Sequence, residues 1–255
     1  MRPYPRPDET LLTGNRDCVS ARLSPTEDLG RSYYRHVLSV AAPAFGGCQA
    51  WLARMEPFKA ISMMADEAGT IRPASLADAA NLASMHVASW LETYPGLLPD
   101  SMLTSLSVDK RQAMWQQVIG DTPTSGSPKV YIAEIDSKIV GFGSCCNQRT
   151  QTLRESGYDG EISAIYVLKA FQRRALGRRL LCVMASDLSG RGFGAASLWV
   201  LRDNSPARRF YERHGAQVVA EREETRPDGV LIEVAYGWKP LAELARLTGA
   251  DTTAA

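Results

Sequence analysis

A cluster of arginines at a predicted helix start is the feature of this sequence with the clearest chemical meaning. Residues 172–179 contain Arg173, Arg174, Arg178 and Arg179 but no acidic residue. A helix N-terminus carries about half a positive charge and favours acidic side chains, so arginines there are unfavourable unless an anion lies among them. Unpaired helix N–H groups together with guanidinium groups are suited to holding a pyrophosphate. An arginine-rich solvated face is the alternative.

The residues around this cluster predict a strand, a short turn and then a helix. Residues 161–167 alternate as a strand, and the helix is predicted over about residues 175–188. Its apolar residues recur every four positions and should anchor it to a sheet: they are Leu176, Leu180, Met184 and Leu188. This order of elements favours the anion site over the solvated face.

A second candidate region is the short helix predicted at residues 206–214. Asn204 or Ser205 can cap it, and Gly215 can end it. Tyr211 lies in its apolar stripe, and a phenol of pKa about 10 is protonated at neutral pH and can donate a proton. Packing in the core is the alternative role of this tyrosine.

The whole pattern predicts a mixed α/β fold. The predicted order is one strand, two helices, three strands, a helix, a strand, a helix and two strands, with a β-α-β unit in the second half. The patterned region spans residues 70–240. Residues 1–69 are expected to form a largely disordered or irregular extension, and residues 241–255 a C-terminal tail.

Composition excludes several classes of protein. The chain has 255 residues, and its 29 Lys and Arg balance 28 Asp and Glu, so no net field recruits nucleic acid or an anionic membrane. We expect no membrane span and no secretory signal, and therefore a cytoplasmic protein. The five cysteines and His86 lack the spacing of metal ligands, so we expect no metal. A homodimer is compatible with the sequence, which does not decide the oligomeric state.

Several segments together resemble the GNAT superfamily of acetyl-CoA-dependent N-acetyltransferases. The family motif R/Q-x-x-G-x-G/A reads QRRALG here, so Ala175 replaces the first glycine. The segment GEISAIYVLKAFQ resembles the family's fourth strand, and LWVLRDNSPARRFYERHGAQ its fifth strand and fourth helix. The segment HVASWLETYPGLLP resembles the first helix and substrate-side loop of one bacterial branch. The resemblance covers residues 70–240 and implies a mostly antiparallel central sheet flanked by helices.

The resemblance implies acetyl-CoA as co-substrate and assigns residues to it. The pantetheine arm should contact the backbone of three strand residues, and the turn should hold the pyrophosphate. These cofactor-binding residues are Ile165, Tyr166, Val167, Gln172, Arg173, Arg174, Ala175, Leu176, Gly177, Arg178 and Asn204. For Asn204, helix capping is an equally good explanation.

The resemblance also implies two catalytic residues. Tyr211 matches a tyrosine that protonates the departing thiolate, and Glu161 matches a glutamate that deprotonates the amine through water. A solvent-facing glutamate at a strand edge is the alternative for Glu161, and some family members have no dedicated base.

The acceptor is implied to be a primary amine, on a small molecule or a peptide, which attacks the thioester directly. Trp90, Glu92, Tyr94 and Leu97–Leu98 fall in the acceptor loop, where they could bind a cationic amine or pack the corner. The rival function is a non-catalytic or weakly catalytic acyl-CoA-binding or sensory module on the same fold. A second rival enzyme uses a longer acyl group or another carrier.

Overall fold

The computed structural model describes residues 69–121, 126–226 and 229–246. The expected N-terminal extension, apart from Gly69, and residues 247–255 of the expected tail lie outside the described residues. No helix in the described ranges is long and apolar enough to cross a membrane.

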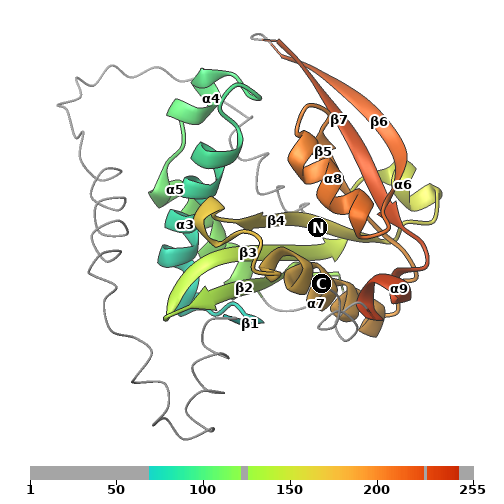
Figure 1. Ribbon diagram of the computed structural model, residues 1–255, viewed down its shortest axis with the longest axis horizontal. Helices are drawn as coiled ribbons and strands as arrows, with labels where there is room; N and C mark the ends of the chain where they lie inside the picture. Colours follow the sequence, from blue (N-terminus) through green and yellow to red (C-terminus); the bar gives the residue numbers. More distant parts are fainter. Residues whose placement is uncertain (1–68, 122–125, 227–228, 247–255) are drawn as a thin grey trace, which may run out of the picture. The chain divides into compact units, whose positions relative to one another are not determined.

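Within the described residues, seven strands form one sheet in the order β1-β2-β3-β4-β5-β7-β6 (Figure 1). All neighbours are antiparallel except β4 and β5, which are joined through helix α7. The predicted mixed, mostly antiparallel fold is therefore confirmed, with all seven predicted strands. The strands are β1 Thr70–Pro73, β2 Lys129–Ile135, β3 Lys138–Asn147, β4 Gly160–Val167, β5 Ala196–Leu201, β6 Gln217–Arg226 and β7 Gly229–Trp238.

Helices cover the sheet in two groups, α3 with α5 on one face and α7 with α9 on the other (Figure 1). Three short helices, α4, α6 and α9, have no counterpart in the prediction, because five or six residues are too few to show a helical period. The helical segments are η3 Leu76–Asp78, α3 Ala79–Thr93, α4 Asp100–Thr104, α5 Val108–Gly120, α6 Gln151–Glu155, η4 Lys169–Phe171, α7 Leu176–Gly190, α8 Ser205–Arg213 and α9 Leu241–Arg246.

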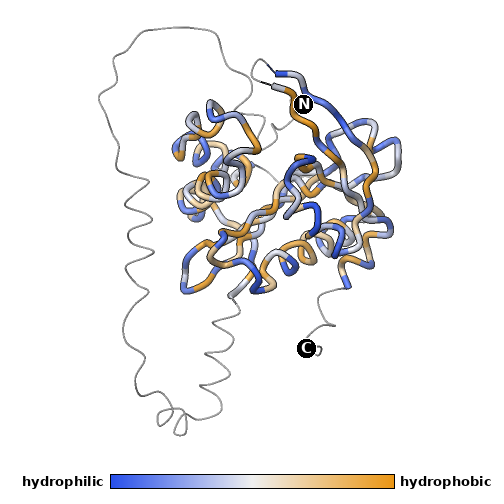
Figure 2. The backbone as a smooth tube through the Cα atoms, turned by 45° about the horizontal axis from the view of Figure 1, so that its top comes forward, coloured by the Kyte–Doolittle hydropathy of each residue, from blue (hydrophilic) through white to orange (hydrophobic). Residues whose placement is uncertain are grey.

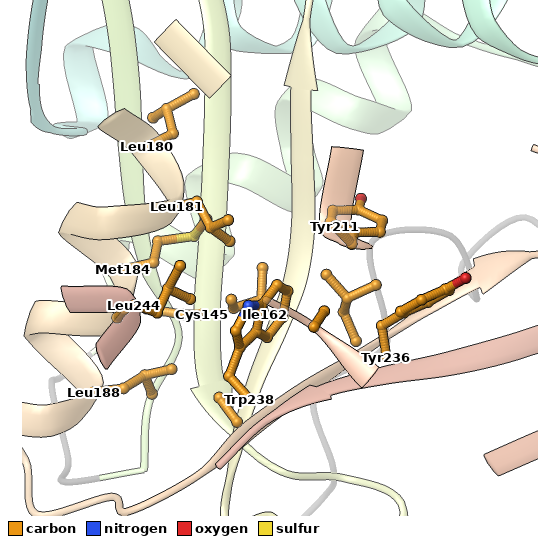
Figure 3. Close-up of a cluster of buried hydrophobic side chains, with 14 of the residues drawn as sticks. Cys145, Ile162, Leu180, Leu181, Met184, Leu188, Tyr211, Tyr236, Trp238 and Leu244 are labelled. Atoms are coloured by element: carbon orange, nitrogen blue, oxygen red, sulfur yellow. The ribbon is translucent and has the colours of Figure 1, made fainter. Parts of the chain in front are cut away.

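The apolar stripe of α7 forms the centre of one core. All four predicted stripe residues, Leu176, Leu180, Met184 and Leu188, are at most 1% exposed. Figure 3 shows the side chains of α7 directed at the strands, where they meet Trp238 and other residues of the sheet. Hydropathy agrees with this burial. In Figure 2, α7 carries hydrophobic positions, in orange, whereas the outer part of β6 is hydrophilic, in blue. This packing fixes the position of the α7 N-terminus.

The other core lies under α3 and α5. Helical spacing in the sequence predicts an apolar stripe here, made of Leu76, Ala79, Ala80, Ala83, Val87 and Trp90, and this prediction is partly wrong. Leu76 is 58% exposed, whereas Leu82 and Met85, which the prediction omitted, are fully buried. The reason is local: Ser75 caps a 3-10 turn at residues 76–78, and α3 begins after it. A 3-10 turn rotates each residue further than an α-helix does, so the buried face of α3 does not continue the spacing from Leu76.

Two adjacent cysteines, Cys145 and Cys146, lie in β3. Cys145 belongs to the core under α7 and Cys146 does not, as expected for neighbours on a strand. Burial raises the pKa of both thiols, which keeps them neutral. Both are free thiols and act as small buried side chains.

Strands β4 and β5 separate soon after they meet. Their ladder consists of the pairs Gly160↔Ala196 and Glu161↔Ser197, and none of the later described residues of the two strands pair with each other. On its other side β4 stays paired with β3 as far as Val167. The sheet is therefore split in its middle, with backbone groups of β4 and β5 left outside any ladder.

Helix α9 extends the folded region beyond the boundary expected at Pro240. Its Leu241 and Leu244 are at most 1% exposed and join the core that contains α7. The first residues of the expected tail thus pack as part of the domain.

We predict that Leu244→Ala destabilises the protein by about 2–5 kcal/mol, because it removes a buried leucine and leaves a cavity. Denaturant unfolding measures this change. Glu243→Ala, an exposed change in the same helix, is the control and should stay within about 0.5 kcal/mol of the wild type. Equal effects of the two substitutions would show that α9 does not belong to the core.

Candidate active site

A cavity of about 1070 Å³ opens where β4 and β5 separate. Its walls are residues 162–167 of β4 and 198–201 of β5, the start of α7, helix α8, the segment between α3 and α4, and parts of β6 and β7. Ligand pockets commonly have volumes of about 300–1,000 Å³, so this cavity has room for a large ligand. The two candidate regions of the sequence, the arginine-rich turn and the Tyr211 helix, both line it.

The turn before α7 contributes most of the residues predicted to hold a phosphate. Gln172, Arg173, Ala175, Leu176, Gly177 and Arg178 all line the cavity. The amide of Gln172 donates to the carbonyl of Val167 at 3.0 Å, so this side chain closes the turn. Arg174 is not among the lining residues, and its guanidinium carbon lies 5.8 Å from the centroid of the Phe171 ring. Arg179 is also elsewhere and donates to the carbonyl of Gly69 at 3.0 Å.

Two residues of this turn have left-handed backbone conformations. Arg173 has φ 61° and Ala175 has φ 58°, and Ala175 is the N-cap of α7. Glycine occupies such conformations without strain, whereas other residues lose about 1–2 kcal/mol there. The position where the family motif has its first glycine therefore has the backbone that favours glycine, and this chain carries alanine.

Gly177 sits where α7 approaches α8. A Cβ atom on Gly177 would lie 3.3 Å from the ring of Phe210, closer than ordinary van der Waals contact. Glycine thus allows α8 to pack against the first turn of α7. This contact brings the Tyr211 helix and the arginine-rich turn to the same cavity.

Further cationic residues line the cavity that the sequence reasoning did not single out. They are Lys169 after β4, Arg209 and Arg213 on α8, and Arg222 and Arg226 on β6, of which the last two form ion pairs with Glu233 and Glu224. Arg209 and Arg213 are four residues apart and share a helix face, a spacing that could have revealed them. Their positive charge adds to that of the α7 N-terminus.

Tyr211 is buried, 7% exposed, and lines the cavity. Its ring packs near Tyr236 and Trp238, with centroid distances of 6.0 and 6.1 Å (Figure 3). No described residue hydrogen-bonds its hydroxyl group. Burial, and secondarily the nearby Tyr166, raises the pKa of Tyr211 above its ordinary value, so the phenol keeps its proton at neutral pH.

Asn204 is the N-cap of α8, as one of the two interpretations predicted. Its side-chain oxygen accepts a hydrogen bond from the N–H of Ala207 at 3.3 Å. Asn204 also lines the cavity, so capping does not remove it from contact with a ligand.

Glu161 is buried, but it is not among the residues that line the cavity. Its carboxylate accepts hydrogen bonds from Nη2 of Arg149 at 2.6 Å, from Nε at 3.1 Å and from the Arg149 backbone N–H at 3.0 Å. This carboxylate is fully engaged where the structure places it. Arg149 could not be identified as its partner from residue spacing, because helix α6 separates the two residues in the chain.

The predicted acceptor-loop residues Trp90, Glu92, Tyr94, Leu97 and Leu98 all line the cavity. Glu92 accepts a hydrogen bond from the backbone N–H of Lys169 at 2.8 Å. The hydroxyl of Tyr94 is hydrogen-bonded to that of Tyr166 at 2.8 Å.

The two contacts tie the end of α3 and the loop after it to η4 and to β4. The loop residues therefore both pack against neighbouring elements and line the cavity.

Among the residues that the structure describes, no group of three or more His, Cys, Asp or Glu could hold a metal ion.

The sequence and the fold match those of known acetyltransferases. Residues 89–216 match the Acetyltransferase (GNAT) family. The chain is 34% identical over 180 residues to the uncharacterized N-acetyltransferase YuaI of Bacillus subtilis, covering 70% of this chain and 97% of YuaI. The chain therefore belongs to the GNAT family of acetyltransferases. It is also 37% identical over 82 residues to an uncharacterized N-acetyltransferase of Archaeoglobus fulgidus, covering 32% of this chain and 55% of that protein.

Solved structures share the fold at lower identity. PaiA N-acetyltransferase of Thermoplasma acidophilum, solved in complex with coenzyme A, is 21% identical with a TM-score of 0.51, covering 64% of this chain and 96% of PaiA. YncA of Salmonella typhimurium, solved with its cofactor acetyl-CoA, is 21% identical with a TM-score of 0.50. The match covers 67% of this chain and 93% of YncA. At this identity the likeness establishes the fold.

We predict that Ala175→Gly stabilises the protein, because it removes the strain of a left-handed alanine. The gain should be about 0.5–1 kcal/mol, since the greater freedom of glycine in the unfolded chain offsets part of it. Denaturant unfolding measures it. The control Ala80→Gly, on the exposed face of α3, should instead destabilise by about 1 kcal/mol. A loss of stability in Ala175→Gly would show that the left-handed backbone of Ala175 is not strained.

Proposed function

We propose that this protein transfers the acetyl group of acetyl-CoA to a primary amine, which attacks the thioester directly. The observation that carries the proposal is the split between β4 and β5, with a cation-rich helix start lining the cavity in it. An extended arm can enter between separated strands, and a diphosphate can bind the helix N-terminus. PaiA and YncA, which share the fold, were solved with CoA and acetyl-CoA.

The cofactor would bind along β4 and the turn that follows. Backbone groups of Ile165, Tyr166 and Val167 line the split and can hydrogen-bond the amides of the pantetheine arm. The diphosphate would lie on the N–H groups of the α7 N-terminus, with Arg173 and Arg178 beside it. Arg174 would contribute less, because it does not line the cavity.

The reaction needs proton transfer at two places. As the amine nitrogen bonds to the thioester carbon and the C–S bond breaks, the nitrogen loses a proton and the sulfur gains one. Tyr211 would supply the proton to sulfur, because its raised pKa keeps the phenol protonated and no described residue engages its hydroxyl. Glu161 stays a prediction as the base, and it would have to exchange its hydrogen bonds with Arg149 for one with water.

We further propose a cytoplasmic location, which the expected reducing environment of the cysteines supports; those the structure describes are free thiols. The test of the function itself is turnover. Purified protein is incubated with acetyl-CoA and a panel of primary amines, among them polyamines, amino acids and peptides with free N-termini, and free thiol is followed. Release of thiol with matching N-acetylated product is expected for at least one class. Binding of CoA without turnover on any amine would favour the acyl-CoA-binding module instead.

We predict that Arg173→Ala weakens CoA binding about three- to tenfold, because it removes a cationic partner of the diphosphate. Isothermal titration calorimetry measures the affinity. Arg174→Ala is the matched control and should stay within about twofold, as its side chain lies over Phe171 outside the cavity. Equal losses in both variants would mean that the turn acts through net charge and not through a defined site.

We predict that Tyr211→Phe lowers kcat about 100-fold while the affinity for CoA changes little, because it removes the proton donor and keeps the ring. Steady-state kinetics and calorimetry on the same preparation separate the two effects. A parallel loss of kcat and of CoA affinity would show that Tyr211 packs or contacts the cofactor and does not protonate it.

A further inference from the structure

Two arginines of α8 line the cavity without a partner in the part of the chain that the structure describes. Arg209 and Arg213 lie four residues apart, about one turn of the helix, and both line the cavity. Neither forms an ion pair or a side-chain hydrogen bond with any described residue. Arg222 and Arg226 of β6 also line the cavity, but each is paired with a glutamate. Helix α8 thus presents two unpaired positive charges to the cavity.

The other charged residues of α8 are bound by the protein itself. Arg208 donates from Nε to the hydroxyl of Tyr236 at 3.0 Å and from Nη1 to the carbonyl of Arg202 at 2.9 Å. Tyr236 in turn donates its hydroxyl hydrogen bond to Glu212. Neither Arg208 nor Glu212 is among the residues that line the cavity. The helix therefore has one charged face that packs on β7 and another that is available to a ligand.

Helix stability does not explain the two cavity-facing arginines. A cation in the last turn of a helix is favourable, which accounts for Arg213 alone. Arg209 lies in the middle of the helix, where the dipole gives no such gain. Like charges four residues apart on a helix repel each other. The pair therefore costs stability unless an anion lies beside it.

Packing places this pair next to the first turn of α7. A Cβ atom on Gly177 would lie 3.3 Å from the ring of Phe210, so the two helices meet closely at this point. The ring of His214 packs on Phe210 from the other side of the sequence, with centroids 4.5 Å apart. Phe210 follows Arg209 directly, and Arg213 is its neighbour one turn later. The two guanidinium groups thus belong to the cavity wall beside the turn that would bind the diphosphate.

Coenzyme A offers a second anion at this place. Its ribose carries the diphosphate on the 5′ oxygen and a phosphate monoester on the 3′ oxygen, so the sites for the two groups must be neighbours. A phosphate monoester carries about −1.5 to −2 charges at pH 7 and has several strong hydrogen-bond acceptors. Guanidinium groups bind such an anion through paired N–H donors. Arg173 and Arg178 are assigned to the diphosphate, which leaves the α8 pair for the other phosphate.

We propose that Arg209 and Arg213 bind the 3′-phosphate of coenzyme A. This site makes the protein selective for coenzyme A over the otherwise identical compound that lacks the 3′-phosphate. The selectivity comes from α8, whereas the general affinity for the cofactor comes from β4 and the α7 turn. This inference rests on the proposed acetyltransferase function, because it concerns the cofactor of that reaction.

The experiment measures the affinity of the full-length protein for coenzyme A and for 3′-dephospho-coenzyme A by isothermal titration calorimetry. The wild type should bind coenzyme A about tenfold more tightly, a moderate factor because the contacts are exposed to solvent. Arg209→Ala and Arg213→Ala should each reduce this preference about threefold, and the double variant should bind the two compounds within about twofold of each other. The affinity of the double variant for the dephospho compound should equal that of the wild type, which shows that the variant is folded.

Two further variants separate this site from net charge and from the diphosphate site. Arg208→Ala is the matched control, because it removes the same charge from the same helix outside the cavity and should keep the tenfold preference. Arg173→Ala should weaken the binding of both compounds by the same factor, because both carry the diphosphate, and should leave the preference unchanged.

Equal affinities of the wild type for the two compounds would overturn the 3′-phosphate site and leave the proposed function standing. A preference that the double variant retains, or that Arg208→Ala loses to the same extent, would do the same. No heat with either compound in the wild type would overturn both the site and the proposed function.

Discussion

The separation of β4 from β5 is the constraint on which the site depends. Two residue pairs join the strands, and the cavity begins where the pairing stops. Each side of the split is held independently, β4 by its ladder with β3 and β5 by its ladder with β7. The sheet can therefore remain stable with its middle open, and the unpaired backbone groups of β4 and β5 stay accessible to a ligand.

The second requirement is that a positive helix end lines this opening. The stripe from Leu176 to Leu188 holds α7 on the sheet and thereby directs its N-terminus to the cavity. Gly177 lets α8 approach, which adds Arg209 and Arg213 and places Tyr211 at the same cavity. The left-handed Ala175 shows that local backbone strain is tolerated to keep this turn in shape.

Sequence reasoning succeeded where local pattern determines structure. The seven strands, the α7 stripe and the cap of α8 follow from period and residue type, and each was found. It failed where structure depends on contacts between distant segments. The pairing of Glu161 with Arg149 and of Tyr94 with Tyr166 leaves no trace in spacing or composition. The prediction of which α3 residues are buried was partly wrong, because a 3-10 turn before the helix rotates its buried face.

We propose that the α7 turn binds the diphosphate of coenzyme A, and calorimetric titration with coenzyme A and with pantetheine is the sharpest test of this site. Pantetheine keeps the thiol arm and lacks the nucleotide and its diphosphate. We expect coenzyme A to bind with measurable heat and with an affinity that falls as salt rises, and we expect pantetheine to bind far more weakly. Equal affinities for the two compounds, or no heat with coenzyme A, would contradict it.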